Sequence, residues 1–149
     1  MAEILPFLVY IIIVLLIIWV YRKKFTTQIN LPPVIPQEGI SIPITNAYQG
    51  TRFFNVHSSL WAVLILFEDH FEFRIISKKT FSFGNVKSVD VNSGFWNGGR
   101  TSLSISFNNG AWNYAAYMNK HNLHEVLNYF KSKGCLLTPK AEEFLSLPL

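Results

Sequence analysis

The chain has 149 residues, of which 50% are hydrophobic, and a formal net charge of +4 at pH 7. A chain of this length has room for one ordinary domain and an appendage. Its cations are scattered without a basic helix or arm, which argues against a nucleic-acid-binding protein. The single cysteine, Cys135, excludes a disulfide within the chain and fits a reducing compartment.

An uncharged apolar run extends from Ile4 to Tyr21. As a helix it is about 27 Å long, close to the roughly 30 Å hydrocarbon core of a bilayer. Trp19 and Tyr21 stand where an interfacial aromatic belt is expected. A cleaved signal begins with basic residues and ends in small ones, and this run has neither. We therefore expect residues 1–24 to be an uncleaved anchor that contacts membrane lipid.

Three cations, Arg22, Lys23 and Lys24, follow the run directly, and none precedes it. Basic residues beside a membrane span tend to stay on the cytoplasmic side. We therefore expect a single-pass protein of the inner (cytoplasmic) membrane, with its N-terminus outside and the C-terminal domain in the cytoplasm.

Residues 25–47 contain four prolines and show neither a helical nor a strand period. Such a composition is typical of an extended, semi-rigid spacer, which at about 3.1 Å per residue reaches on the order of 70 Å when drawn out. An arm packed against the domain is the alternative. Either interpretation puts the domain boundary near residue 48.

Alternating sequence beyond that point predicts antiparallel strands. Apolar residues alternate with serines over 101–107, and Asn109-Gly110 leads into a second alternating stretch, 111–118. Alternation joined through Asn-Gly is a strong hairpin signal. The apolar run 60–67 is too short to cross a bilayer as a helix and is interpreted as a strand buried on both faces. Strands at 52–57 and 71–77 and two short pieces within 80–92 bring the count to seven.

The period changes to that of an amphipathic helix after the last strand. Apolar residues recur at i, i+3, i+4 and i+7, with Asn119 as the N-cap and Gly134 at the end. The tail, residues 136–149, is either irregular or holds a short helix from Pro139 to Leu145.

Seven short strands followed by one amphipathic helix resemble a pleckstrin-homology-like (PH-like) domain. TFSFGNVKSVDV, residues 80–91, is similar to a stretch of bacterial PH-like and GRAM-type domains, where an aromatic strand leads through a polar turn into an apolar strand. The resemblance covers roughly residues 50–134. It implies an α+β, mainly β fold over residues 48–135: a bent antiparallel sheet or partly open barrel capped by a C-terminal helix.

Residues 93–100 are a candidate contact loop. Two adjacent aromatics, Phe95 and Trp96, stand among three glycines, and Arg100 follows. Large aromatic side chains and arginine are frequent anchors at interfaces. The loop is expected to touch a partner or the bilayer interface, or alternatively to plug the end of the barrel.

Lys78 and Lys79 are the second candidate for partner or membrane contact, because they lie near Arg74 and Lys87 on adjacent predicted strands. Each cation near an anionic leaflet contributes about 1 kcal/mol of attraction. Scattered solubilising charge is the alternative. Many PH domains bind phosphoinositides through basic residues of their first two strands, but the early turn 68–70 is acidic here and argues against that site.

Metal binding and catalysis are not expected. His121, His124 and Glu125 have a spacing that suits a metal pair on a helix, but two ligands do not make a site. The sequence has no nucleophile elbow, phosphate-binding loop, dinucleotide fingerprint or zinc-protease motif. We expect neither a cofactor nor an enzyme.

These features predict a membrane-anchored, non-catalytic PH-like interaction module, an accessory or adaptor subunit of a membrane protein complex. The expected partners are membrane lipid, through the N-terminal helix, and another membrane protein, but not nucleic acid. The alternative is a module that binds lipid or the membrane surface on the inner leaflet. The oligomeric state is left open.

Overall fold

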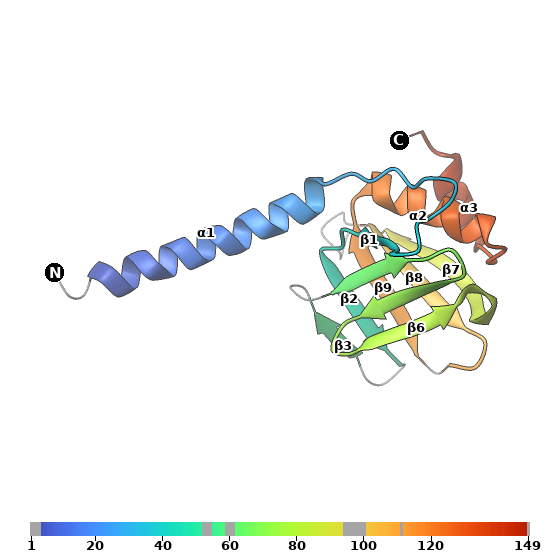
Figure 1. Ribbon diagram of the computed structural model, residues 1–149, viewed down its shortest axis with the longest axis horizontal. Helices are drawn as coiled ribbons and strands as arrows, with labels where there is room; N and C mark the ends of the chain where they lie inside the picture. The colour runs from blue at the N-terminus through green and yellow to red at the C-terminus, as the bar shows by residue number, and fades with distance from the viewer. Residues whose placement is uncertain (1–3, 52–54, 59–61, 94–100, 111, 149) are drawn as a thin grey trace.

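The computed structural model of the chain describes residues 4–51, 55–58, 62–93, 101–110 and 112–148. A long helix, two antiparallel sheets and two C-terminal helices make an α+β, mainly β fold. The predicted fold class is confirmed. The long helix extends away from the domain that the rest of the chain forms (Figure 1).

The first helix, α1 (Ile4–Thr26), is 23 residues long, with Lys23 and Lys24 in its last turn. Within the described residues it is the one helix long and apolar enough to cross a membrane, and a signal sequence near an N-terminus has the same properties. Its large apolar side chains are mostly exposed. The Lys23 ammonium lies 5.3 Å from the centre of the Trp19 ring. The basic and aromatic flank therefore lies at the end of α1 that joins the domain.

In the part of the chain that the structure describes, nine strands form two sheets, and all pairings between these strands are antiparallel. The four-stranded sheet has the order β1 (Ile40–Ile42), β4 (Val63–Leu66), β5 (His70–Arg74), β6 (Lys78–Ser82). The five-stranded sheet has the order β3 (Asn55–Ser58), β2 (Asn46–Gly50), β9 (Asn113–Met118), β8 (Thr101–Phe107), β7 (Val86–Ser93). A turn of 3-10 helix, η1 (Phe83–Asn85), joins β6 to β7 and so connects the two sheets.

Residues 40–50 are the main departure from the sequence prediction. They form β1, which pairs with β4 in one sheet, and β2, which pairs with β3 in the other. The segment β1–β2 and the segment β3–β4 together make one long hairpin that extends over both sheets. The prediction of an unpaired spacer is wrong from Ile40 onward, and nine strands replace the expected seven. The missed signal is the alternation of Ile40, Ile42 and Ile44. Pro43 obscures it, because proline cannot donate a ladder hydrogen bond and separates the two strands.

Aromatic rings fill the space between the sheets. The buried Phe71 ring of β5 lies 5.3 Å from Phe83, 6.3 Å from Phe107 of β8 and 5.1 Å from Phe130, measured between ring centres. Phe130 belongs to α2 (Lys120–Ser132). Both sheets and α2 therefore share one core.

The helices after β9 agree with the sequence prediction. The side chain of Asn119 caps α2, and Gly134 follows its end with φ 78°. The tail does contain a helix, α3 (Pro139–Ser146). Between the two helices, the Val89 N–H donates to Leu136 O at 2.8 Å, and the Thr138 N–H donates to Val89 O at 3.0 Å. This segment covers the outer edge of β7.

Residues 27–39, which we call the arm, pack along α2. The Ile29 N–H donates to Asn122 Oδ1 at 2.9 Å, and the Leu31 N–H donates to Glu125 Oε2 at 3.0 Å. The drawn-out spacer is therefore wrong for this segment too, and the packed arm is confirmed. Hydrogen-bond donors of the arm find acceptors on polar side chains of α2, which a composition rich in proline does not reveal.

A second attachment lies further along the arm. The Ile35 side chain is buried, and its N–H donates to Glu68 Oε2 at 3.2 Å. Lys133, just after α2, donates to the other oxygen of the same carboxylate. The hydrogen bonds from Lys133 and then Ile35 lower the pKa of Glu68 from its usual value. One carboxylate thus joins the arm, the turn before β5 and the end of α2.

Candidate functional site

β9 runs between two different ends of the barrel. Where it finishes, Asn119 Nδ2 donates to Phe25 O and to Thr27 O, both at 2.9 Å. Phe25 O lies in the last turn of α1, where carbonyls have no partner further along the helix, and Thr27 O belongs to the first residue of the arm. The Asn119 amide therefore holds the end of α1 and the start of the arm together. We call this the anchor end. The five steps from Asn113 to Met118 put the opposite end, which we call the open end, about 17 Å away.

A groove at the open end lies between β6 and the turn from β8 to β9, with a volume of about 280 Å³. We call it the aromatic groove. Its lining combines aromatic rings with a few polar side chains: Lys79, Phe81, Asn85, Phe107, Asn109, Gly110, Trp112 and Tyr114. Grooves of this composition bind ligands through apolar contact, and a small number of polar groups fix the orientation.

The rings of the groove pack against one another. Phe81 lies 4.5 Å from Phe107 and 5.0 Å from Tyr114, measured between ring centres. The Lys79 ammonium lies 5.9 Å from the centre of the Trp112 ring and 6.0 Å from that of Tyr114. Tyr114 is only 3% exposed, whereas Trp112 is 39% exposed. Tyr114 therefore belongs to the floor of the groove and Trp112 to its rim.

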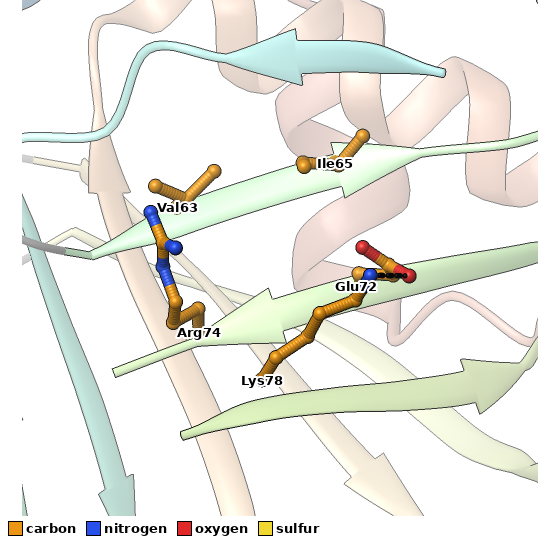
Figure 2. Close-up of a pocket in the computed structure, with 5 residues that line it drawn as sticks. All are labelled: Val63, Ile65, Glu72, Arg74 and Lys78. Atoms are coloured by element: carbon orange, nitrogen blue, oxygen red, sulfur yellow. Dashed lines mark ion pairs between the residues drawn. The ribbon is translucent and has the colours of Figure 1, made fainter. Parts of the chain in front are cut away.

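A second, smaller pocket of about 160 Å³ lies on the face of the four-stranded sheet. We call it the sheet-face pocket. Figure 2 shows its five lining residues: Val63 and Ile65 on β4, Glu72 and Arg74 on β5, and Lys78 on β6. The Lys78 ammonium lies 2.7 Å from Glu72 Oε1, with the Glu72 side chain 10% exposed and that of Lys78 63% exposed. The one carboxylate of the pocket is therefore already paired.

β6 separates the two sites. Successive side chains of a strand point to opposite faces, so Lys78 borders the sheet-face pocket while Lys79 and Phe81 border the aromatic groove. β6 is also the last strand of its sheet. Within the described part of the chain, no backbone hydrogen bond reaches its outer side. This arrangement offers apolar surface, positive charge and free backbone groups side by side, which suits recognition of another molecule.

The structure brings together only part of the predicted basic patch. Arg74 and Lys78 line one pocket, Lys79 faces the aromatic groove, and Lys87 lies on β7 and lines neither site. The candidates Phe95, Trp96 and Arg100 lie outside the described residues. The predicted basic patch is thus divided, because the side chains of the adjacent residues Lys78 and Lys79 point to opposite faces of β6.

The histidines of α2 hold other parts of the chain. His121 Nε2 lies 2.8 Å from Ile29 O, and His124 Nε2 lies 3.4 Å from Leu145 O. Glu125 accepts the hydrogen bond from the arm described above. Among the residues that the structure describes, no group of three or more His, Cys, Asp or Glu is placed to hold a metal ion.

The chain was compared with known proteins. No protein-family model matches it. No curated protein matches it either. The fold and the two sites are therefore the basis for a proposed function.

Of the residues that line the groove, Lys79 is predicted from the sequence as a contact residue, but the aromatic residues are not predicted as a site. Phe81, Phe107, Trp112 and Tyr114 come from three segments and were interpreted as strand faces. The available signal was that each is an aromatic on the alternating face of its strand, close to a turn. The same signal is expected of aromatic residues in the core of the domain. Only the position of a residue at the open end distinguishes the rim of the groove from the core.

Proposed function

We propose that this protein is a membrane-anchored, non-catalytic PH-like interaction module that serves as an accessory or adaptor subunit of a membrane protein complex. The observation that carries the proposal is the anchor end. Asn119 and Asn122 bind the last carbonyls of α1 and the start of the arm, so the domain cannot swing freely away from the helix. A domain held at the membrane surface in one orientation is suited to engage a neighbour in the same membrane.

The domain supports this proposal by its strand order. The first hairpin, β1–β2 with β3–β4, extends over both sheets; β5 and β6 then complete one sheet, and β7, β8 and β9 complete the other. An amphipathic helix packs over the core. This is the order expected for a PH-like domain, and that resemblance implies fold more than function. The interaction role is supported by the open aromatic groove and the unpaired edge of β6.

The basic flank supports an inner-membrane location. Lys23 and Lys24 lie at the end of α1 next to the domain. Because basic residues beside a membrane span tend to stay on the cytoplasmic side, they favour a cytoplasmic domain and an N-terminus outside. A cleaved signal would remove the helix whose final carbonyls Asn119 binds, so the same contacts favour an uncleaved anchor.

The test is affinity purification of the tagged, full-length protein from native membranes in mild detergent, with the recovered proteins quantified by mass spectrometry. We expect one membrane protein at near-stoichiometric amounts. Recovery of the protein alone from several detergents would contradict the subunit role.

Contact with lipid on the inner leaflet is a second candidate function, favoured by one observation. Ser93 pairs with Thr101, which in turn pairs with Met118 at the anchor end. Ser93 and Thr101, the described residues that flank positions 94–100 in the sequence, therefore lie on the side of α1. In nanodiscs, anionic lipid should then slow amide exchange at Thr101 relative to neutral lipid, and salt should remove the part due to charge. Equal exchange in both lipids would contradict this function.

A further inference from the structure

We propose that β6 is a docking strand for an extended, acidic segment of a partner protein. That segment would pair with the outer edge of β6, put an apolar side chain into the aromatic groove and bring a carboxylate to Lys79. This inference rests on the proposed function and deepens it, because it names the surface through which the anchored domain meets its partner.

The backbone of β6 is the first observation. Four of its five residues are exposed, and only Phe81 is half-buried. Its outer N–H and C=O groups bond to no other backbone group within the described residues. Exposed edge strands of this kind are templates for an added strand. The outer edge of β7, by contrast, is already covered by residues 136–138.

The two pockets are the second observation. Side chains of a strand added to β6 would alternate between its two faces. Those on one face would lie over Phe81 and the rim residue Trp112, and those on the other would lie beside Lys78 and Arg74. A single extended segment therefore contacts both sites, which a compact ligand in either pocket does not.

Charge identifies the partner's chemistry. Arg74, Lys78 and Lys79 lie around β6, and the sheet-face pocket offers only Glu72, which is paired with Lys78. Lys79 forms no ion pair within the described part of the chain, although its ammonium lies near two aromatic rings. An acidic segment complements this surface. A second copy of β6 would instead add two lysines and no carboxylate.

The position of the groove favours a protein segment over a lipid headgroup. The aromatic groove includes Trp112 and Tyr114 at the start of β9, whereas α1 is bound where β9 finishes. That separation is about 17 Å along the strand. A headgroup also has no backbone to pair with β6.

The test measures binding of fluorescein-labelled peptides to the full-length protein in detergent by fluorescence anisotropy. The probe is a peptide of about ten residues in which every second residue is threonine and the residues between them are phenylalanine and aspartate in turn, so that one face carries both an apolar side chain for the groove and a carboxylate for Lys79. Two control peptides carry lysine in place of aspartate, or proline at two central positions, which removes backbone donors. We expect the acidic peptide to bind at least about tenfold more tightly than either control.

Variants of the protein locate the binding. Lys79→Glu and Trp112→Ser should each weaken binding of the acidic peptide by about tenfold, because one reverses the charge and the other removes the rim. Lys140→Glu, the same charge change on α3, should alter binding by less than about twofold. Thermal unfolding of each variant checks that it folds. The peptide should also slow amide exchange across Lys78–Ser82.

Several outcomes would overturn the docking strand. They are equal binding of all three peptides, undiminished binding by both groove variants, and protection of amides elsewhere instead of at β6. Self-association of the full-length protein that Lys79→Glu abolishes would replace the partner with a second copy.

Cross-linking of the natural complex separates this inference from the proposed function. A stoichiometric membrane partner that cross-links only far from β6 would leave the subunit role standing and refute the docking strand. Specific peptide binding at β6 in a protein that is always recovered alone would support the strand and refute the stable subunit.

Discussion

The two ends of the barrel are closed in different ways. At the anchor end, the chain uses its own arm and the carbonyls of α1, held by amide and carboxylate groups of Asn119, Asn122 and Glu125. At the open end, aromatic rings close the core but leave Trp112 partly exposed, and no backbone group of the described residues pairs with the outer edge of β6. Directional hydrogen bonds fix an orientation, whereas an apolar rim can accept more than one occupant. This difference is the basis on which we propose that one end attaches the domain and the other recognises a partner.

The largest expected effect separates the floor of the groove from its rim. Tyr114→Ala should lower the free energy of unfolding by about 3–5 kcal/mol, because it removes a buried ring from the aromatic cluster. Trp112→Ala should cost less than about 1 kcal/mol, because that side chain is already partly in water. Urea unfolding followed by far-ultraviolet circular dichroism measures both. A loss at Trp112 as large as that at Tyr114 would make the rim part of the core.

Next in size is the polar closure of the anchor end. Asn122→Ala should lower the free energy of unfolding by about 1–3 kcal/mol, because it removes a fully buried amide and leaves the half-buried Ile29 N–H without its acceptor, whereas Thr27 O keeps its hydrogen bond from Asn119. Asn128→Ala, on the exposed face of the same helix, is the matched control and should cost within about 0.5 kcal/mol. Amide exchange at Ile29 should accelerate only in the first variant. Unchanged exchange there would show that the arm does not depend on Asn122.

A smaller effect concerns the second attachment of the arm. The pKa of Glu68 is lowered from 4.5 in the folded protein, so its contribution is present above that value and is lost as the pH falls through the folded pKa. The pKa of Lys133 is raised from 10.5, mainly by its hydrogen bond to Glu68, so its contribution is lost as the pH rises through the folded value.

Between those limits, the difference in unfolding free energy between wild type and Glu68→Gln should be constant. It should begin to shrink as the pH falls below 4.5, where the carboxylate of the unfolded chain is protonated, and should be lost as the pH falls through the lower pKa of the folded protein. Unfolding curves across the acidic range test this. A difference that is independent of pH would exclude the Glu68 carboxylate as the group that titrates.

The last prediction concerns the chemical reactivity of Cys135 and not the stability of the protein. Cys135 is buried behind η1, and burial raises its pKa to about 11. Because the thiolate is the reactive form, iodoacetamide should alkylate native protein slowly at pH 8 and unfolded protein quickly. Mass spectrometry with and without urea measures the two rates. Fast alkylation of the native protein would indicate that the side of the barrel beneath residues 136–138 opens readily.

The sequence predicted correctly those elements that depend on residues close together in the chain. The hairpin of β8 and β9, the cap at Asn119 and the spacing of α2 depend on residues within one or two turns of each other. The packing of the arm could not be predicted in this way, because Ile29 binds Asn122, which is 93 positions away in the sequence. The prolines of the arm are also typical of an unattached spacer. The aromatic groove escaped for the same reason: no single segment distinguishes Trp112 at a rim from Phe107 beside it.

The distance in sequence between the arm and its binding residues imposes an order on biosynthesis. α1 and the arm are translated first, while Asn119, Asn122 and Glu125 follow roughly 5–20 s later at ordinary rates of elongation. During that interval the arm and the end of α1 have no binding residues to meet. The contacts that fix the domain to α1 therefore form only after α2 has been made.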